Sequence, residues 1–212
     1  MVEVYLLNLA DRLELPVEKY LRYFTAKRQE KILSYKFTAD RNRTIWAELL
    51  ARSVIAKKLS RTIEKIQIER DANGKPYVVD SEIKISLSHS ENWAACSIGE
   101  VASGVDVEEN FADALTLAEN FFTAREYREL CGLDGLARGE KFLSLWTIKE
   151  SFAKMTGREL DAALKVDSAN ILGRNFFVGN AVVGVCIERG NLPENFKVVS
   201  LPAQFATARK PR

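Results

Sequence analysis

The sequence predicts a mixed fold of helices and strands that is built from two similar halves. Apolar residues at helical spacing and short β-branched segments both occur in each half of the chain. Each half contains one long helix with a tryptophan, Trp46 or Trp146, and strands follow that helix. No Pro/Gly-rich linker divides the chain, and no apolar run approaches the ~20 residues that cross a bilayer.

The composition excludes several classes of protein. Of the 212 residues, 47% are hydrophobic and 28% are charged, which is ordinary for a soluble globular protein. The net charge of +2 gives no overall signal for nucleic-acid binding, so any basic site must be local. The N-terminus lacks a basic segment followed by an apolar one, and three widely spaced cysteines form no C-x-x-C pair. We therefore expect a cytoplasmic protein without a disulfide framework or zinc site, and without nucleic-acid or membrane partners.

Local signals place the elements of the first half. Pro16 suits a first helical turn, and Thr25 and Asp40 are residue types that cap helices. Residues 71–76 contain Asn-Gly and a proline, which predicts a turn. The expected strands are 2–9, 66–69, 83–88 and 93–98, and the expected helices are 16–23, 26–35 and 40–59.

The second half repeats this mixture. Three glycines predict a loop over 131–139, and Gly157 is expected to end the helix that follows this loop. The basic tail 206–212 is expected to be frayed. The expected strands are 104–109, 181–188 and 196–201, and the expected helices are 114–122, 124–130 and 140–155.

The strand at 104–109 carries two acids on one face. Asp106 and Glu108 are two residues apart, so their side chains project together while Val105 and Val107 face the core. Neighbouring carboxylates repel each other unless something neutralises them, and Mg²⁺ does so with oxygen ligands. From these residues alone, the pair is either a metal site or a solvated strand edge.

The helix at 140–155 carries a third acid beside a lysine. Trp146, Glu150 and Lys154 recur at four-residue spacing, so they share one helix face. The bland interpretation is a surface ion pair beside a core tryptophan. The functional interpretation makes Glu150 a third carboxylate at the metal of Asp106 and Glu108, with the positive charge of Lys154 beside it.

The only histidine, His89, lies between Ser88 and Ser90. A lone histidine is more often structural than catalytic. A Ser–His hydrolase needs a spatial partner that the sequence does not show, and metal ligation normally recruits more His or Cys. We favour His89 as a hydrogen-bond donor to an anion such as phosphate, together with a serine hydroxyl.

Basic residues cluster in the first half. Arg28 and Lys31 share a face of one predicted helix, Arg43 lies near the start of the next, and Lys75 follows the turn glycine. Charged runs are usually solvated surface. Arginine and lysine are also the common binders of phosphate, so the alternative is a local site for a polyanion.

Taken together, four stretches resemble the 4′-phosphopantetheinyl transferases. Residues 104–108 (GVDVE) are similar to the family's G-[IV]-D-[IVL]-E motif, and residues 146–154 (WTIKESFAK) to its W-[ST]-x-K-E-[AS]-x-x-K motif. Residues 88–90 match its S-H-S strand end, and residues 74–76 its G-K-P turn. The order and spacing resemble the full-length subtype typified by the surfactin-synthetase activator. Two departures stand out: Ser86 occupies a position where the family often has asparagine, and Glu109 adds an acid after the first motif.

The resemblance implies an α+β fold with two similar α/β halves in a pseudo-two-fold arrangement and an active site in the cleft between them. Residues 1–103 would form the half that binds the nucleotide of coenzyme A. Residues 104–212 would form the half that binds the metal and performs catalysis. Because one chain supplies both halves, the resemblance implies a monomer.

The implied activity is transfer of the 4′-phosphopantetheine moiety of coenzyme A to a serine of an apo acyl or peptidyl carrier protein, with release of 3′,5′-ADP. Asp106, Glu108 and Glu150 would hold Mg²⁺, or Mn²⁺ in its place. The implied catalytic residues are Glu150, Lys154 and Asp106. The residues implied to bind coenzyme A are Arg28, Lys31, Arg43, Thr44, Lys75, Ser88, His89 and Lys154.

Two other functions fit the same residues. A Mg²⁺-dependent nucleotide pyrophosphohydrolase would use the acids with water as the nucleophile. A coenzyme-A-binding regulatory protein would bind the coenzyme without turnover over any carrier.

Overall fold

The computed structural model describes residues 1–10, 15–110, 114–202 and 205, so the predicted tail at 206–212 lies outside the described part. Its strands are β1 (Glu3–Asn8), β2 (Ile68–Arg70), β3 (Pro76–Val78), β4 (Lys84–His89), β5 (Trp93–Gly99), β6 (Ser103–Glu108), β7 (Gly173–Val178), β8 (Ala181–Ile187) and β9 (Phe196–Val198). Its α-helices are α1 (Val17–Leu21), α2 (Ala26–Leu33), α3 (Thr38–Leu59), α4 (Ala114–Phe121), α5 (Ala124–Cys131), α6 (Gly135–Thr156) and α7 (Leu160–Leu164). Short 3-10 turns span Ile63–Lys65 and Ser168–Asn170.

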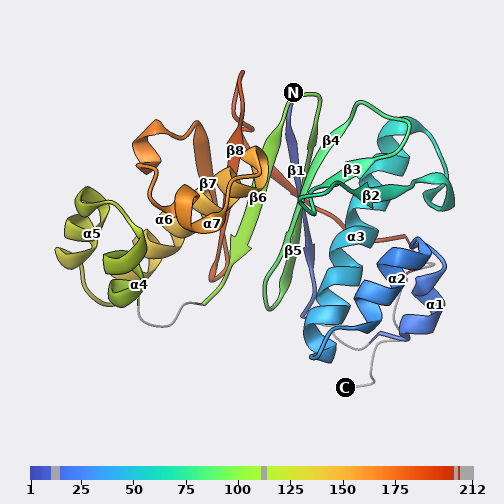
Figure 1. Ribbon diagram of the computed structural model, residues 1–212, viewed down its shortest axis with the longest axis horizontal. Helices are drawn as coiled ribbons and strands as arrows, with labels where there is room; N and C mark the ends of the chain where they lie inside the picture. The colour runs from blue at the N-terminus through green and yellow to red at the C-terminus, as the bar shows by residue number, and fades with distance from the viewer. Residues whose placement is uncertain (11–14, 111–113, 203–204, 206–212) are drawn as a thin grey trace.

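The predicted α+β fold with two halves is confirmed. In the described residues, one sheet has the strand order β2-β3-β4-β5-β1-β9 and the other the order β6-β8-β7. The two sheets lie beside each other at the centre of the molecule, with α3 on the outer side of the first and α6 on the outer side of the second (Figure 1). Both helices have 22 residues, and each ends at a left-handed residue, Ser60 or Gly157.

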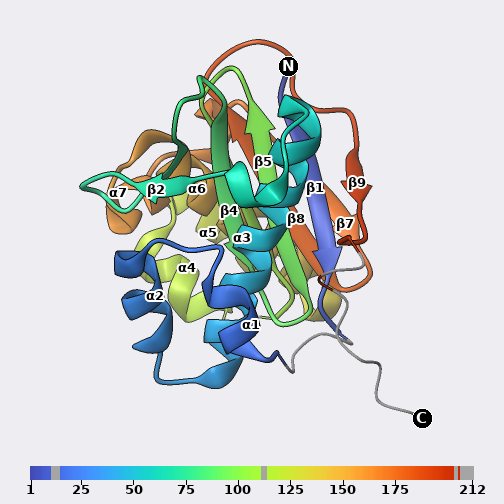
Figure 2. The ribbon, with the colours of Figure 1, turned by 90° about the vertical axis from the view of Figure 1, so that its right-hand side faces the viewer.

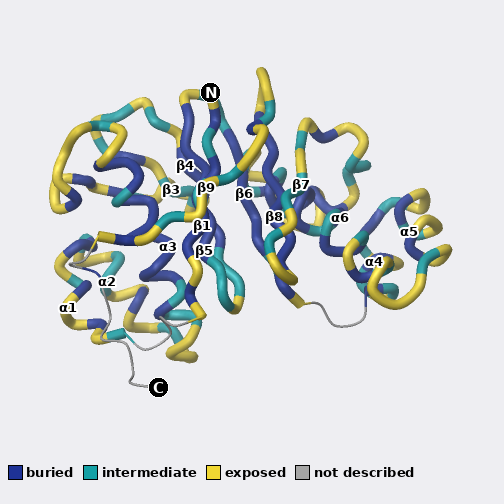
Figure 3. Tube along the Cα trace, turned by 180° about the vertical axis from the view of Figure 1, so that it is seen from behind, coloured by how far each residue is buried: buried dark blue, intermediate teal, exposed yellow. Residues whose placement is uncertain are grey.

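Alternation along the central strands explains this layering. In β5, Ala94, Cys96 and Ile98 join the core under α3, whereas Ala95 joins the core between the sheets. In β6, Val105 and Val107 also point into the core between the sheets, as predicted. The central strands and both long helices are mostly buried, and exposed residues concentrate in the outer helices and connections (Figure 3).

Strand register brings the two halves together at the site. β4 and β5 are antiparallel, with Ser88 opposite Ala95. β6 and β8 are antiparallel, with Asp106 opposite Gly184. The hydroxyl of Ser86 on β4 accepts a hydrogen bond from the backbone N–H of Val105 on β6 at 3.1 Å. β4 and β6 belong to different sheets, so this side-chain hydrogen bond links them where no backbone ladder does in the described residues.

The last strand returns to the first sheet. β9 pairs in parallel with β1, as seen from the α3 side in Figure 2. Beyond it, Phe205 is buried and its ring lies 5.2 Å from that of Tyr23. The predicted division at residues 103 and 104 remains a prediction, although β9 pairs with β1 and Leu201 and Phe205 pack in the core of the first half.

The approach of α6 to the second sheet depends on two glycines. A Cβ on Gly104 of β6 would lie 1.8 Å from the carbonyl oxygen of Ser151 on α6. A Cβ on Gly184 of β8 would lie 2.5 Å from the carbonyl oxygen of Thr147. No real Cβ tolerates such contacts, so a side chain at either position would push the helix away. This gives a physical reason for the glycine that opens the GVDVE stretch.

Some local predictions were wrong. The loop predicted for 131–139 is helical from Gly135, because Arg138 donates from the first turn of the helix to the carbonyl of Leu133 at 2.8 Å. Asp134 takes the N-cap position without a side-chain hydrogen bond. Asp40 does not cap α3. The N-cap is Phe37, and Asp40 lies in the first turn, where it accepts a 2.8 Å bond from Arg43.

The sequence analysis also missed three short elements, β3, α7 and β7. β3 and α7 have three and five residues, too few for a periodic pattern to show. β7 reads GRNFFV, and its polar residues and glycine hide its strand character.

We predict that Gly104→Ala destabilises the protein by about 3 kcal/mol or more, because the added methyl meets helix backbone that cannot move independently. Urea unfolding measures the change. Gly132→Ala is the matched control, because its Cβ would meet its nearest atom at 3.5 Å. Equal stability of the two variants would contradict the close packing of α6 on β6.

Candidate active site

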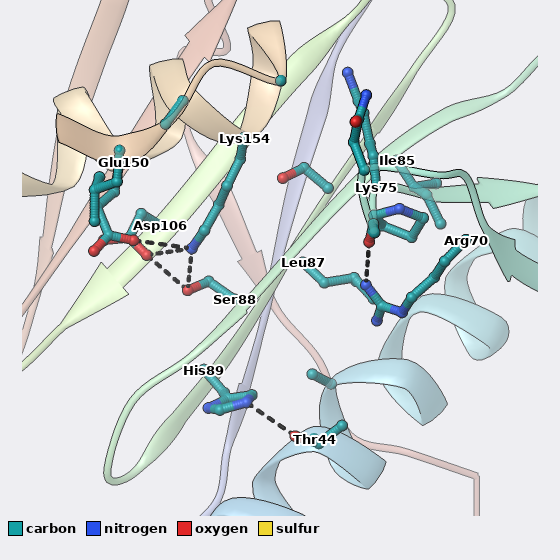
Figure 4. Close-up of a pocket in the computed structure, with 18 of the residues that line it drawn as sticks. Thr44, Arg70, Lys75, Ile85, Leu87, Ser88, His89, Asp106, Glu150 and Lys154 are labelled. Carbon is teal, nitrogen blue, oxygen red and sulfur yellow. Dashed lines mark hydrogen bonds and ion pairs between the residues drawn. The ribbon is translucent and has the colours of Figure 1, made fainter. Parts of the chain in front are cut away.

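A cavity of about 830 Å³ lies where the two halves meet. Side chains from the first half and from β6 and α6 of the second half both line it (Figure 4). The sequence-predicted residues that line it are Arg28, Thr44, Lys75, Ser88, His89, Asp106, Glu108, Glu150 and Lys154.

Asp106 is the centre of the polar contacts in this cavity. Its side chain is buried, and its Oδ1 accepts hydrogen bonds from Ser88 Oγ at 2.7 Å and from Lys154 Nζ at 2.6 Å. Lys154 Nζ also lies 3.0 Å from Ser88 Oγ and 3.6 Å from Glu150 Oε2. The strand and the helix therefore bring their charged residues together, as the functional interpretation of both motifs predicts.

The acids of the cavity repel one another. Burial, then the charges of Asp106 and Glu150, raise the pKa of Glu108 to about 8. Burial, then the charge of Asp106, raise the pKa of Glu150 to about 7. Burial alone would lower the pKa of Lys154, but the charges of Asp106 and Glu150 hold it above its usual value. One ammonium group is thus left to balance three carboxyl groups.

The acids fit a divalent cation, although no group of three or more His, Cys, Asp or Glu side chains in the described residues is already arranged around a metal position. Instead, the ammonium of Lys154 lies between the carboxyl groups of Asp106 and Glu150, at 2.6 Å and 3.6 Å. Asp106 Oδ2 is buried and has no hydrogen-bond partner, and hard cations prefer such carboxylate oxygens. The predicted Mg²⁺ site is therefore chemically consistent and stays a prediction.

His89 lines the same cavity at the end of β4. Its Nε2 lies 3.2 Å from Thr44 Oγ1 on α3. Burial, then the charges of Lys154 and Arg43, lower the pKa of His89 to about 4, so the ring is neutral near pH 7. The pair presents hydroxyl and imidazole groups that can hydrogen-bond an anion.

Two predicted basic residues lie outside the cavity, and a third is engaged elsewhere. Lys31 is exposed, and its ammonium lies 5.9 Å from the ring centroid of Tyr35. Arg43 donates to Asp40 at 2.8 Å and to the carbonyl of Glu91 at 3.3 Å. Lys75 lines the cavity, but its Nζ donates to the carbonyl of Met155 at 2.6 Å and so joins the first half to the end of α6.

Sequence reasoning missed Arg70 and Glu48, which also line the cavity. Glu48 Oε1 accepts from Arg70 Nη2 at 2.9 Å and from Arg28 Nε at 2.6 Å. The sequence offered only a weak signal, a Glu48–Arg52 pair at i, i+4 on a helix that is otherwise apolar on its buried faces.

Glu109, the additional acid, has a structural role. Its carboxylate accepts hydrogen bonds from the backbone N–H of Asn92 at 2.5 Å and from Asn92 Nδ2 at 2.9 Å. These bonds fix the β4–β5 turn, next to the strand end that carries Ser88 and His89.

Lys149, the lysine before Glu150 in the helix motif, is fully buried. Its three donors meet Glu126 Oε2 at 2.8 Å and the carbonyls of Leu164 and Val166 at 2.6 Å each. Burial lowers the pKa of Lys149. This lysine locks α6 against α5 and α7, and it does not line the cavity.

Comparison with known proteins identifies the class. The family model described as the 4′-phosphopantetheinyl transferase superfamily matches residues 102–181, and the model described as 4′-phosphopantetheinyl transferase, N-terminal, matches residues 16–100. The chain is 30% identical to 4′-phosphopantetheinyl transferase psf-1 of Bacillus pumilus over 156 residues, which is 73% of this chain and 67% of the relative.

Two further relatives agree. The identity is 29% to 4′-phosphopantetheinyl transferase Sfp of Bacillus subtilis (strain 168), over 73% of this chain and 68% of the relative. It is 30% to 4′-phosphopantetheinyl transferase HetI of a Nostoc species, over 64% of this chain and 56% of the relative. The chain therefore belongs to the 4′-phosphopantetheinyl transferase superfamily, so it is a transferase that moves phosphopantetheine to carrier proteins, and the resemblance seen in its motifs is confirmed.

The three cysteines are free. In the part of the chain that the structure describes, no helix combines the length and apolar character needed to cross a membrane.

We predict that Lys149→Met destabilises the protein by about 3–5 kcal/mol, because it leaves the buried carboxylate of Glu126 with only the half-exposed Arg125, at 3.9 Å, as a counter-charge. Chemical denaturation measures the change. Lys141→Met on the same helix is the control, since the Lys141–Glu129 pair is partly exposed and should be worth less than about 1 kcal/mol. A loss for Lys149→Met no larger than that of the control would rule out this role.

Proposed function

We propose that the protein transfers the 4′-phosphopantetheine moiety of coenzyme A to a serine of an apo acyl or peptidyl carrier protein and releases 3′,5′-ADP. The observation that carries the proposal is the cluster of Asp106, Lys154 and Glu150 in a cavity that both halves line. The cavity thus has an acid-rich centre that suits a cation. Its polar wall from the first half suits a nucleotide.

The residues of the cluster have separate tasks in this scheme. The serine oxygen of the carrier forms a bond to the β-phosphorus of coenzyme A, and the bridging bond to the α-phosphate breaks. The leaving 3′,5′-ADP takes the electron pair, so negative charge grows on the α-phosphate. Lys154, held by Asp106 at 2.6 Å, supplies a positive charge for that group.

Glu150 is the proposed acceptor of the serine proton, directly or through a bound water. A serine hydroxyl is a poor nucleophile unless its proton leaves as it attacks. Glu150 is half-buried and lies on α6 next to Lys154, so it can reach the same reacting group. Ser88 fixes Asp106 through its 2.7 Å hydrogen bond.

Asp106, Glu108 and Glu150 would hold a divalent cation, Mg²⁺ or Mn²⁺, which when bound neutralises pyrophosphate charge and acts as a Lewis acid. The unpartnered Oδ2 of Asp106 supports this assignment. Thr44, His89 and Lys75 would bind the nucleotide and its phosphates, with Lys75 leaving its contact to Met155 or acting through its backbone.

We further propose a monomer, because one chain supplies both walls of the cavity, and sedimentation velocity tests this. The three free cysteines favour a reducing cytoplasm. The comparisons give no support to a pyrophosphohydrolase or to a non-catalytic binder of coenzyme A.

Intact-mass spectrometry tests the proposed reaction. The protein, coenzyme A and Mg²⁺ are incubated with a panel of apo carriers, and a carrier that is served should gain about 340 Da. The gain should vanish in excess EDTA and with Asp106→Asn, whose fold is checked by circular dichroism. Release of free 4′-phosphopantetheine with no carrier modified would instead identify a hydrolase.

For Glu150→Gln we expect a fall in kcat of about 10²–10⁴, the range typical for loss of general-base assistance, while coenzyme A still binds through its phosphates. Glu140→Gln, an exposed acid on the same helix, is the control. If saturating Mg²⁺ restores full kcat to Glu150→Gln, this residue is a metal ligand and not a base.

A further inference from the structure

Glu109, the acid that follows the two strand acids of the site, is 4% exposed. In the described residues, the ladder between β6 and β8 ends at the pair Glu108–Val182, so Glu109 lies just beyond it. A buried carboxylate is costly unless its oxygens are hydrogen-bonded. Both oxygens of Glu109 are used by one residue: Oε2 accepts from the backbone N–H of Asn92 at 2.5 Å, and Oε1 accepts from Asn92 Nδ2 at 2.9 Å.

Two more contacts tie the β4–β5 turn to the end of β6. Ser90 Oγ donates to Glu108 Oε2 at 3.3 Å, and Asn110 Nδ2 donates to Glu91 Oε2 at 3.0 Å. Three successive residues of the turn thus each contact one of three successive residues at the end of β6. Because β4 and β5 belong to the first sheet and β6 to the second, these contacts join the two sheets at their ends.

The influence of these contacts on the site passes through Glu108. Among the six residues concerned, all of which the structure describes, only Glu108 lines the cavity. His89, which precedes the turn, has supports of its own. Its Nε2 lies 3.2 Å from Thr44 Oγ1, and its backbone lies opposite Ala94 in the β4–β5 ladder. The carboxylate of Glu108 is therefore the cavity group that depends on where the turn lies.

The position of Ser90 depends in turn on Asn92. The carbonyl of Asn92 accepts from the backbone N–H of Leu9 on β1 at 2.7 Å, and Glu109 takes up its N–H and its side-chain amide. The contact from Ser90 to Glu108 is longer than the two bonds to Glu109, and O–H···O bonds are usually shorter than about 3.0 Å. A small displacement of the turn is therefore enough to break it.

We propose that Glu109, through Asn92 and the hydroxyl of Ser90, positions the carboxylate of Glu108 for the divalent cation. Hydrogen bonds of this kind orient the ligands of metal ions and affect how tightly the ion is held. The inference rests on the proposed function, which gives Glu108 to the cation. It makes the acid in which this chain departs from the family motif a positioning residue, and Ser90 its link to the cavity.

Mn²⁺ binding tests the proposal without catalysis. The paramagnetic resonance signal of free Mn²⁺ is titrated with protein in the presence of coenzyme A and the absence of carrier, against a blank without protein. Glu109→Gln keeps the size of the side chain but accepts from only one of the two Asn92 donors. It should raise the Kd for Mn²⁺ about 10-fold, the lower end of the range for partners of metal ligands.

Glu188→Gln is the matched control, because it removes the same charge from an exposed residue just beyond the opposite end of β8. This variant should bind Mn²⁺ as the wild type does. Circular dichroism checks that each variant is folded at the temperature of the titration, so a loss of stability alone leaves the measured affinity unchanged.

An exchange of the two partners tests the contact itself. Asn92→Asp alone places two carboxylates against each other and should weaken Mn²⁺ binding at least as much as Glu109→Gln. The double variant Asn92→Asp/Glu109→Gln restores both hydrogen bonds with donor and acceptor reversed, and it keeps the net charge. It should recover most of the lost affinity.

Ser90→Ala tests the link to Glu108. It should weaken Mn²⁺ binding by a factor similar to that of Glu109→Gln, and the two losses should not add, because they interrupt one chain of contacts. Additive losses would show that Glu109 does not act through Ser90.

Three further results would overturn the proposal. Unchanged Mn²⁺ affinity of a folded Glu109→Gln variant would exclude a positioning role. An equal loss in Glu188→Gln would reduce the effect to net charge. No Mn²⁺ binding by the wild-type protein would contradict the assignment of Glu108 to the cation as well. Mn²⁺ binding without modification of any carrier would instead contradict the proposed function alone.

Discussion

The structure depends on the close approach of α6 to the second sheet. Gly104 and Gly184 leave no side chain between the helix backbone and strands β6 and β8. Because the helix lies this near, Lys154 Nζ reaches Asp106 Oδ1 at 2.6 Å, and Glu150 Oε2 lies 3.6 Å from the same ammonium group. The glycine of the first motif therefore allows the close helix packing that brings the charged residues of the second motif to Asp106. This is a physical reason for the two motifs to occur together.

Buried carboxylates recur in this protein, and each is balanced differently. Glu126 is matched by one fully buried lysine, Lys149, whose three donors are all used, and this locks the outer helices to α6. Asp106 shares one lysine with two other acids and retains an unpartnered oxygen. Glu48 has an excess of arginines around it. The first cluster is closed and lies outside the cavity, whereas the other two carry opposite imbalances of charge on opposite walls of the cavity. A substrate with anionic groups, bound together with a cation, would satisfy both imbalances.

Local periodicity placed the acids and Lys154 in register with one another, but it did not reveal the contacts of the wall that the first half supplies. Two-residue spacing put Asp106 and Glu108 on one strand face, and four-residue spacing put Glu150 and Lys154 on one helix face. The structure brings both sets to one cavity. Arg70 and Glu48 are 22 residues apart on different elements, so only tertiary packing reveals their contact. The resemblance implied that Arg43 binds coenzyme A, but spacing along the helix does not encode its 2.8 Å hydrogen bond to Asp40. The prediction of a loop over 131–139 gave too much weight to three glycines, and α6 begins at Gly135 even though Asp134 at the N-cap position makes no side-chain cap hydrogen bond.

The central claim is that a divalent cation and coenzyme A share the cavity between the two halves. Anomalous diffraction from crystals grown with Mn²⁺ and coenzyme A tests it most directly. The account predicts one strong manganese peak within bonding distance of Asp106 and Glu150, with Glu108 beside them and the coenzyme pyrophosphate next to the peak. A map without a peak there, with Lys154 still bonded to Asp106 while coenzyme A is bound, would contradict it.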